Sequence, residues 1–228
     1  MPKGKFIVIE GTDGTGKGTQ TKLLVDRLMR EGYAVRMFDF PRYGNPSAAL
    51  VEKYLRGEMG GLSDVPPEVA SMFYAHDRRM AAPDIRRALA EGSVVISNRY
   101  VASNLGHQGS KFDDDKSRVA YFHWDYETEF GYFGIPKPDL NLILHVPPEI
   151  AQKRVDAKVA RQYIGGKKRD LHETDLGHLE RSERVYLQLA KLFPGQFRVL
   201  ECVVDGCELT EQEVHERVWK IVRKSLSI

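Results

Sequence analysis

The residues best suited to chemistry lie near the amino terminus, in a glycine-rich segment that ends in lysine. Residues 11–17 read GTDGTGK and match the pattern G-x-x-x-x-G-K. Glycines let backbone N–H groups point inward around a phosphate, a following helix adds positive potential at its N-terminus, and lysine supplies a point charge. We expect this loop to bind the phosphates of ATP, with Lys17 also active in catalysis. The predicted loop contacts are Gly11, Thr12, Asp13, Gly14, Thr15, Gly16, Lys17, Gly18 and Thr19.

One position in this loop departs from the general pattern. Gly18 stands where a Ser or Thr hydroxyl would normally bind Mg²⁺, and Thr19 follows one residue later. The ending Gly-Lys-Gly-Thr-Gln resembles the phosphate loop of adenylate kinases. Because phosphate loops serve ATPases, GTPases and kinases alike, the loop alone does not identify the second substrate.

Two further groups of basic residues could hold phosphates. Arg42 follows a predicted strand, where its guanidinium can grip an acceptor phosphate with two N–H groups. A basic segment, approximately 157–173, contains Gly165-Gly166 and no acidic residue up to position 169. We interpret it as a lid, since phosphoryl transfer needs cations around the migrating group and exclusion of water; a solvated surface loop is the alternative. Its basic residues are Lys158, Arg161, Lys167, Lys168 and Arg169, of which Arg161 and Arg169 are the catalytic candidates.

Five short apolar segments must position these residues. They are apolar throughout, and segments of helical periodicity separate them, beginning with residues 17–30. Strands of this kind form a parallel sheet that helices cover on both faces. The predicted fold class is α/β: a single-domain P-loop kinase fold over residues 1–228, with a five-stranded parallel sheet flanked by helices and a basic lid. The predicted strands lie at 6–10, 34–40, 93–97, 140–146 and 197–204.

Composition narrows the classes of function. The 34 Lys and Arg residues nearly balance 32 Asp and Glu, so the chain lacks the basic field that would bring it onto nucleic acid. No apolar run approaches the ~20 residues that span a membrane. Cys202 and Cys207 form neither a zinc motif nor a disulfide framework. We therefore expect a cytoplasmic protein with neither a nucleic-acid nor a membrane partner.

Several motifs taken together resemble one known family. In chain order they are EGTDG at 10–14, FPRYG at 40–44, FYAHDR at 73–78, RYVASN at 99–104, PKPDL at 136–140, DLHE at 170–173 and ERSERVY at 180–186. Their order and spacing resemble those of thymidylate kinases over roughly residues 5–192. The resemblance implies an ATP:dTMP phosphotransferase that uses Mg²⁺ and forms a homodimer.

The resemblance also implies roles for individual residues. Tyr74 matches the aromatic residue that stacks on the thymine ring, and Arg78, one helical turn later, matches the arginine that donates to a thymine carbonyl. Arg42 and Arg99 match the clamps on the acceptor phosphate. The residues implied to bind substrate are Phe40, Pro41, Arg42, Tyr43, Tyr74, Arg78, Arg99, Ser103, Asn104, His107 and Gln108. The catalytic set is Lys17, Asp13, Arg42, Arg99, Arg161 and Arg169.

Three positions depart from the family. Gly18 lacks the metal-binding hydroxyl, and Asn98 stands where the family has the aspartate of an Asp-Arg-Tyr motif. We therefore expect Mg²⁺ to lie nearer the acceptor, where hard oxygen ligands come from Asp13, Asp170 and Glu173 with waters. His107 takes the place of a tyrosine that packs against the sugar and disfavours a ribose 2′-hydroxyl, so selection of deoxyribose stays open.

The expected function is ATP-dependent phosphorylation of dTMP to dTDP by in-line phosphoryl transfer. One alternative is a kinase for another nucleoside monophosphate, namely dUMP, UMP, CMP or AMP. Another is a nucleotide-binding homologue whose catalysis is impaired, because two customary metal contacts are missing. A P-loop ATPase that acts on nucleic acid agrees least with the balanced charge.

Overall fold

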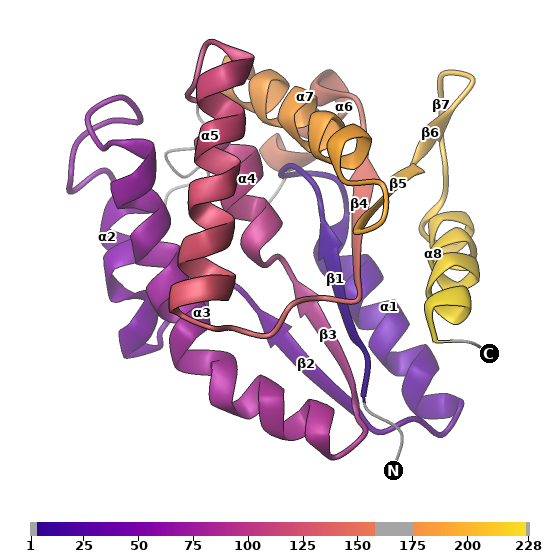
Figure 1. The fold of residues 1–228 in the computed structure, drawn as a ribbon. Coiled ribbons are helices and arrows are strands. Elements are labelled where there is room, and N and C mark those ends of the chain that lie inside the picture. Colours follow the sequence, from indigo (N-terminus) through magenta and orange to yellow (C-terminus); the bar gives the residue numbers. More distant parts are fainter. Residues whose placement is uncertain (1–3, 158–175, 227–228) are drawn as a thin grey trace.

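The computed structural model describes residues 4–157 and 176–226. Residues 1–3, 158–175 and 227–228 lie outside the described part of the chain and are drawn in grey in Figure 1. Apart from Ala157, the predicted lid therefore lies outside the described residues. The same holds for the predicted site residues Arg161, Arg169, Asp170 and Glu173.

A five-stranded parallel sheet runs through the molecule, as predicted (Figure 1). Its strands follow the spatial order β2-β3-β1-β4-β5, so the chain begins in the middle of the sheet. The strands are β1 (Phe6–Glu10), β2 (Val35–Asp39), β3 (Val94–Asn98), β4 (Leu140–His145) and β5 (Phe197–Glu201). Because every pair is parallel, the carboxyl ends of all five strands lie at one edge, where ligands bind in sheets of this type.

Helices connect the strands and cover the sheet. They are α1 (Lys17–Arg30), α2 (Ala49–Leu55), α3 (Pro67–Ala90), α4 (Val101–Gly109), α5 (Asp115–Tyr126), α6 (Pro148–Asp156), α7 (Leu176–Leu192) and α8 (Glu211–Ser225). A short 3₁₀ helix, Pro46–Ala48, precedes α2, and a π-helical segment, Glu127–Tyr132, continues α5. Thr210 caps α8 in a reciprocal pair with Glu213, which satisfies backbone donors at the start of that helix.

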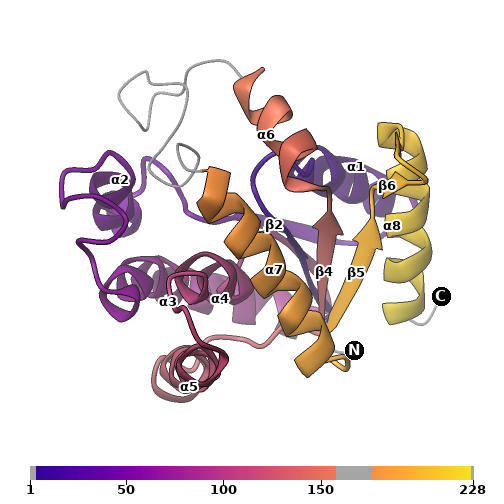
Figure 2. The same cartoon turned by 90° about the horizontal axis from the view of Figure 1, so that it is seen from above.

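Alternate residues of β1 face two different hydrophobic layers. Phe6 and Val8 pack in a cluster with α3, α4, α5 and α7, whereas Ile7 and Ile9 pack in a cluster with α1 and α8. Successive side chains of a strand point to opposite faces, so a strand that is apolar throughout needs cover on both. Figure 2 shows this cover from above, with α8 on one side of the sheet and α3, α4 and α5 on the other.

The fifth strand is shorter than predicted. It ends at Glu201, and residues Val203–Val204 (β6) pair with Cys207–Glu208 (β7) in a separate antiparallel hairpin. The connecting pair, Asp205-Gly206, has φ angles of 52° and 76°. Positive φ at both positions is typical of a two-residue hairpin turn, and Asp-Gly is the sequence signal for that turn.

Candidate active site

The phosphate loop joins the end of β1 to α1, and its backbone leaves no room for a side chain at two glycines. A Cβ atom added to Gly11 would lie 2.5 Å from the Leu144 carbonyl oxygen. One added to Gly14 would lie 2.1 Å from the Ala151 carbonyl oxygen. Both glycines also have positive φ, 134° and 86°. The loop is thus packed against β4 and α6 in a shape that requires the predicted glycines.

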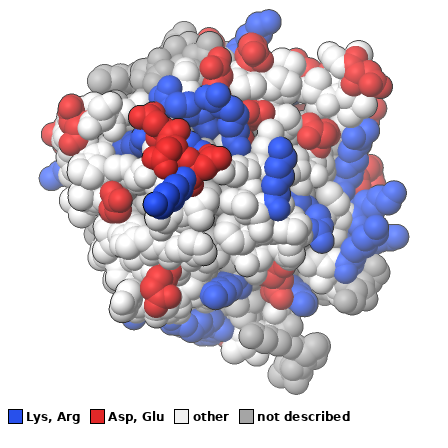
Figure 3. Space-filling model, turned by 45° about the horizontal axis from the view of Figure 1, so that its top comes forward, with Lys and Arg blue, Asp and Glu red and all other residues white. Residues whose placement is uncertain are grey.

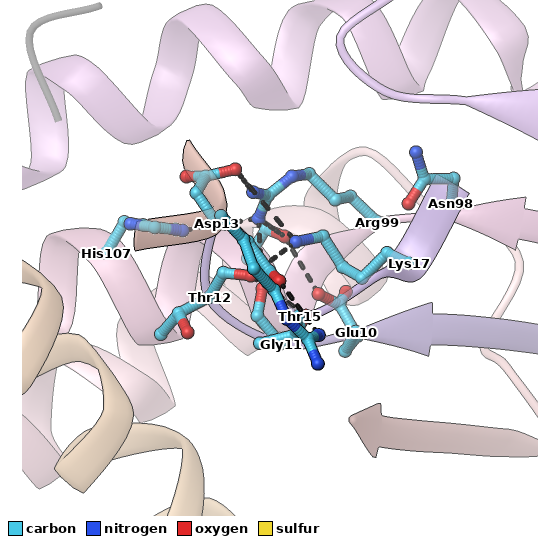
Figure 4. A network of polar contacts seen from close by, with 12 residues as sticks. Glu10, Gly11, Thr12, Asp13, Thr15, Lys17, Asn98, Arg99 and His107 are labelled. Atoms are coloured by element: carbon cyan, nitrogen blue, oxygen red, sulfur yellow. Dashed lines mark hydrogen bonds and ion pairs between the residues drawn. The ribbon is translucent and has the colours of Figure 1, made fainter. Parts of the chain in front are cut away.

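Lys17, the first residue of α1, reaches back across the loop (Figure 4). Its Nζ donates to the Thr12 carbonyl oxygen at 2.6 Å and lies 4.0 Å from Oδ1 of Asp13. Thr15 Oγ1 donates to the same Thr12 carbonyl at 3.0 Å. Only 7% of Lys17 is exposed, so the loop encloses a positive charge where a phosphate would be cradled.

Two cavities meet at the carboxyl edge of the sheet. The first, of about 630 Å³, we call the loop cavity; it is lined by residues 13–20 with Asn98, Arg99, Arg154, Cys202, Leu209, Glu211 and Val214. The second, of about 210 Å³, we call the side-chain cavity. Its lining is Asp13, Asp39, Phe40, Pro41, Tyr43, Leu55, Tyr74, Arg78, Asn98, Arg99, Tyr100, Ser103, Asn104, His107 and Gln108. Asp13, Asn98 and Arg99 line both cavities, so a group bound in one cavity can reach a group bound in the other.

The structure brings together every predicted substrate-binding residue except Arg42 in the lining of the side-chain cavity. Asp77 holds the Arg42 guanidinium beside the cavity, with an Nε to Oδ1 distance of 2.8 Å. Nη2 of Arg42 also donates to Ser47 Oγ at 2.8 Å. The role of Arg42 on the acceptor phosphate stays a prediction.

Arg99 is the first residue after β3 and makes a sharp turn. Its φ is 63°, in the left-handed region that residues other than glycine rarely adopt. The Arg99 amide donates to the Ile9 carbonyl oxygen at 3.0 Å, and the Tyr100 amide donates to Oε1 of buried Glu10 at 2.8 Å. These bonds to the end of β1 hold the turn, which directs the Arg99 side chain into the junction of the two cavities.

The Arg99 guanidinium forms the centre of a polar network at this junction (Figure 4). Nη2 donates to Asp13 Oδ1 at 2.5 Å, and Nη1 donates to the Gly11 carbonyl oxygen at 3.3 Å and to Ser103 Oγ at 3.2 Å. Burial lowers the pKa of Arg99, but Asp13 and then Tyr186, Glu10 and Tyr43 together outweigh burial and raise the pKa above its ordinary value. The junction therefore keeps a fixed positive charge next to a carboxylate.

Arg78 lies in the lining of the side-chain cavity and is paired with a buried acid. Its Nε lies 2.9 and 3.0 Å from the two carboxylate oxygens of Glu129, Nη2 contacts the same carboxylate, and Nη1 donates to the Tyr100 carbonyl oxygen. The two charged side chains are only 2% and 0% exposed. Burial opposes the charge, yet Glu129 raises the pKa of Arg78 above its ordinary value. These contacts leave N–H groups on Nη1 and Nη2 for a ligand in the cavity.

The orientation of the Asn104 amide is fixed by its acceptors. Nδ2 lies 3.2 Å from the Ser71 carbonyl oxygen and 3.3 Å from Oε1 of Glu129. Both partners are acceptors only, so the atom that faces them is the amide nitrogen, and Oδ1 lies on the other side of the amide. Asp125 contributes a third, longer contact at 3.4 Å. Burial, and then the Glu129 carboxylate, raise the pKa of Asp125 well above its ordinary value.

Aromatic and amide groups complete the side-chain cavity. Tyr74 packs edge-on against Tyr54, with ring centroids 6.4 Å apart. Phe40 packs against Tyr100 at 5.6 Å. Gln108 is buried, and its Oε1 has no hydrogen-bond partner among the described residues. The cavity thus combines flat apolar surfaces with a small number of polar groups, which is typical of sites for a planar ligand.

His107 lies beside the Arg99 guanidinium in the lining of the side-chain cavity (Figure 4). Its Nε2 is 3.2 Å from Nη1 of Arg99, and its Nδ1 is 3.3 Å from Nε2 of His178. Burial, and then the Arg99 charge, lower the pKa of His107 well below its ordinary value. The imidazole is therefore neutral at physiological pH.

The oxygen atoms at the junction suit a magnesium ion that phosphates also hold. Asp13 supplies a carboxylate, and Oδ1 of Asn98 is buried without a hydrogen-bond partner among the described residues. Asp39 accepts from Nδ2 of Asn98 at 2.9 Å. Within residues 4–157 and 176–226, no group of three or more His, Cys, Asp or Glu residues could hold a metal. Mg²⁺ commonly binds one or two carboxylates plus phosphates and water, and these residues fit that arrangement.

Three residues that line or support the two cavities are absent from the sequence predictions. Arg154 of α6 lines the loop cavity, where Nη1 donates to the Gly14 carbonyl oxygen at 3.4 Å and Nε donates to Glu208 at 3.1 Å. Its only sequence signal is that it is a basic residue three positions before the start of the basic segment. Glu10 and Glu129 are buried carboxylates that orient the arginine sites, and neither has a sequence signal for its partner.

Comparison with known proteins identifies the family. The family model for thymidylate kinase matches residues 9–217. The thymidylate kinase of Mycobacterium tuberculosis is 35% identical over 202 residues, which cover 88% of this chain and 92% of that protein. The chain belongs to the thymidylate kinase family. This membership confirms the resemblance seen in the motifs and the class of enzyme that the sequence predicts.

Other members of the thymidylate kinase family give the same result. The thymidylate kinase of Caulobacter vibrioides is 32% identical over 203 residues, covering 88% of this chain and 89% of that protein. That of Nitratidesulfovibrio vulgaris is 30% identical and covers 97% of both chains. The structure of thymidylate kinase from Candida albicans has a TM-score of 0.77 at 21% identity, over 97% of this chain and 92% of that one. This likeness confirms the predicted α/β fold.

Proposed function

We propose that this chain transfers the terminal phosphoryl group of ATP to dTMP, giving ADP and dTDP. The observation that carries the proposal is the junction at which Asp13, Asn98 and Arg99 line both cavities. A kinase must hold two phosphates in line and close together, because positioning and electrostatic stabilisation supply most of its catalysis. Membership of the thymidylate kinase family supports the same reaction.

In this proposal the loop cavity binds ATP. The loop amides and Lys17 hold the β- and γ-phosphates, and α1 adds positive potential from its N-terminus. Arg154 borders the same cavity and contributes a second cation. Lys17 leaves its contact with the Thr12 carbonyl when a phosphate oxygen offers a charged acceptor, because a charge-assisted hydrogen bond is the stronger one.

Arg99 holds the acceptor phosphate at the junction. Its guanidinium contacts Asp13, Gly11 and Ser103, so its plane is fixed before a ligand arrives. The phosphate of dTMP is largely dianionic at neutral pH and needs no general base to become a nucleophile. In this proposal Asp13 lies beside both phosphates. Its carboxylate would be repelled by them unless a cation lies between the carboxylate and the phosphates, so Asp13 is proposed to face Mg²⁺.

The base is read by Asn104 and Arg78. Asn104 presents an acceptor oxygen to the cavity, and Arg78 presents N–H donors. Thymine and uracil carry the complementary pair on one edge, an acceptor at O4 and a donor at N3. Cytosine carries the opposite pair, an amino group at position 4 and an acceptor at N3, so it would leave buried polar groups unpaired.

Mg²⁺ belongs to the proposal as the usual partner of the ATP phosphates, where it neutralises charge on the oxygens around the migrating phosphorus. Asp13 and Asn98 are the described residues that would face it, with Asp39 next to Asn98. Asp170 and Glu173 stay predicted ligands, and Arg161 and Arg169 stay predicted lid cations. A cytoplasmic location stays an expectation as well; among the described residues no helix is long and apolar enough to cross a membrane.

A homodimer is also part of the proposal. On α3, Val69, Met72 and Met80 lie on one face and are 46%, 38% and 56% exposed. An apolar stripe on a long surface helix supports packing against a second copy across a twofold axis. On the face drawn in Figure 3, by contrast, basic and acidic side chains are interspersed, which gives no support to a nucleic-acid surface there. Sedimentation velocity measures the oligomeric state directly.

The test of the proposed reaction is ADP release at saturating MgATP with dTMP, UMP, CMP and AMP as separate acceptors. We expect dTMP to have the highest kcat/KM, with CMP and AMP at least ~10³-fold lower, because they mispair with Asn104 and Arg78. Comparable turnover of CMP or AMP would overturn the assignment of dTMP. ATP and dTMP binding without turnover would favour an impaired homologue.

A further inference from the structure

A chain of hydrogen bonds leaves the side-chain cavity at His107, passes through His178 at the start of α7 and ends at Ser110, directly after α4. It runs from Nη1 of Arg99 to His107 Nε2, from His107 Nδ1 to His178 Nε2, and from His178 Nδ1 to Ser110 Oγ. The two imidazole rings stack, with centroids 5.5 Å apart and planes at 27°. His107 is 8% exposed and His178 is 1% exposed. None of the roles described above uses His178.

At the cavity end of this hydrogen-bond chain, Arg99 determines which ring nitrogen of His107 carries the proton. Arg99 is a permanent donor, because an arginine guanidinium in a protein does not lose its proton. His107 Nε2, at 3.2 Å from Nη1 of Arg99, must therefore be the unprotonated nitrogen that accepts. In a neutral imidazole the proton then sits on Nδ1.

At the other end, Ser110 independently determines which ring nitrogen of His178 carries the proton. Ser110 Oγ donates its hydrogen to the His107 carbonyl oxygen at 2.8 Å, so toward His178 it can only accept. His178 Nδ1 therefore carries a proton, and its Nε2 is an acceptor. Ser182 Oγ lies 3.4 Å from that Nε2 but donates to Ser110 Oγ at 3.3 Å.

The two assignments agree where they meet. A donor on His107 Nδ1 faces an acceptor on His178 Nε2 at 3.3 Å. The opposite tautomer of His107 would set two donors, its own Nε2–H and the Arg99 guanidinium, against each other. It would also leave two acceptors facing each other at His178. One arrangement of protons satisfies these contacts among the described residues, and both rings are neutral in it.

We propose that His178 is a positioning residue of the acceptor site: by accepting from His107 Nδ1, it holds His107 in the tautomer whose Nε2 accepts from Arg99. This proposal rests on the proposed role of Arg99 in binding the acceptor phosphate. The two hydrogens of Arg99 Nη1 are shared among the Gly11 carbonyl, Ser103 Oγ and His107 Nε2. With these contacts and Nη2 bound to Asp13, the guanidinium plane is fixed before dTMP enters. His178 thus acts on the reaction through two intermediate side chains and touches no substrate.

Two substitutions of His178 form a matched pair that tests the proposal. In His178→Gln, the side-chain amide reaches the place of Nε2 and offers an acceptor oxygen to His107. In His178→Asn, the amide reaches only the place of Nδ1, so His107 loses the acceptor that His178 offers. Both variants carry the same functional group, and His123→Asn on the exposed face of α5 is the control for the substitution itself.

The first readout is the tautomer of His107 in the wild-type protein without nucleotide, measured by long-range ¹H–¹⁵N NMR, with the signals assigned by their loss in His107→Gln. We expect the Nδ1–H tautomer in the wild type and in His178→Gln, and a shift toward Nε2–H in His178→Asn. An Nε2–H tautomer in the wild type would overturn the proposal. This measurement does not depend on turnover, so its failure is distinct from failure of the proposed function.

The second readout separates the two substrates. We expect His178→Asn to raise KM for dTMP by about tenfold, the order expected when a buried donor loses its acceptor, and to leave KM for ATP unchanged. His178→Gln is expected to stay within about threefold of the wild type for both. Equal effects of Gln and Asn, or an equal rise of both KM values, would show a merely structural role and overturn the proposal.

Discussion

The two cavities of this protein are built in different ways. Residues 13–20, one continuous stretch, supply most of the loop cavity, and in the proposed function backbone amides do much of the binding. The side-chain cavity takes its lining from the ends of β2 and β3 and from α2, α3 and α4, and side chains supply its recognition. A site made by backbone depends on a local pattern of glycines. A site made by side chains depends on the residues that hydrogen-bond to those side chains and hold them in position.

The largest effect expected from this comparison is at Lys17. Lys17→Met removes the point charge of the loop cavity, so kcat should fall by about 10³-fold or more. The midpoint of urea unfolding and the Kd for dTMP should stay near the wild-type values, because the side-chain cavity is unchanged. A variant that turns over at the wild-type rate would contradict the role of the loop.

The next effect tests the support of the side-chain cavity. Glu129→Ala leaves Arg78 as a buried, unpaired charge, and breaking such a pair costs about 3–5 kcal/mol of stability. Urea unfolding should show this loss, and the variant's KM for dTMP should rise more than its KM for ATP. Glu127→Ala, at an exposed position two residues away, is the matched control and should unfold like the wild type.

A smaller effect is expected at Asn104. Asn104→Ala removes the oxygen that accepts from the base, so KM for dTMP should rise by about tenfold while KM for ATP stays constant. Steady-state kinetics with each substrate varied in turn measures both. An equal rise of KM for dTMP and KM for ATP would show that Asn104 has a structural role and would contradict its role in base recognition.

The smallest effect concerns stability at an ion pair outside both cavities. His145, at the end of β4, contacts Glu201 at 2.5 Å and Glu183 of α7 at 2.7 Å. Burial alone would lower the pKa of His145, but the two glutamates outweigh burial and raise the pKa above 6.5. The contribution of this ion pair to the free energy of unfolding is complete below pH 6.5, where His145 is charged in the folded and the unfolded protein. It is lost as the pH rises through the raised pKa of His145 in the folded protein.

His145→Gln should therefore lower the midpoint of urea unfolding more at pH 6 than at pH 9. The kcat of the variant should stay close to the wild-type kcat, since neither cavity includes His145. His123→Gln on the surface of α5 serves as the control. A difference in midpoint that does not change with pH would contradict the charged state of His145.

The sequence predicted the loop cavity better than the support of the side-chain cavity. Gly11, Gly14 and Lys17 form a local motif, and their strand and helix context is local as well, so composition and spacing suffice. Tyr74 and Arg78 were found only through the family resemblance, because one helical turn of spacing fits many surface helices.

Contacts between distant segments could not be predicted from spacing. Glu129 reaches Arg78 across 51 positions of sequence, and Glu10 holds the Tyr100 amide across 90. The periodicity of apolar residues in the sequence does not predict these two contacts, because they depend on how α3, α4 and the end of α5 pack. His178 was missed for the same reason, because its link to His107 exists only after α7 packs on α4.

We propose above all that the buried acids Glu129 and Asp125 hold Arg78 and Asn104 in position. Arg78 and Asn104 then form hydrogen bonds with the edge of a thymine or uracil ring. The most direct test is the ratio of kcat/KM for dUMP to that for dCMP in the wild-type protein, because these acceptors differ only at N3 and position 4. We expect a ratio of at least ~10³ in favour of dUMP. A ratio near one would contradict it.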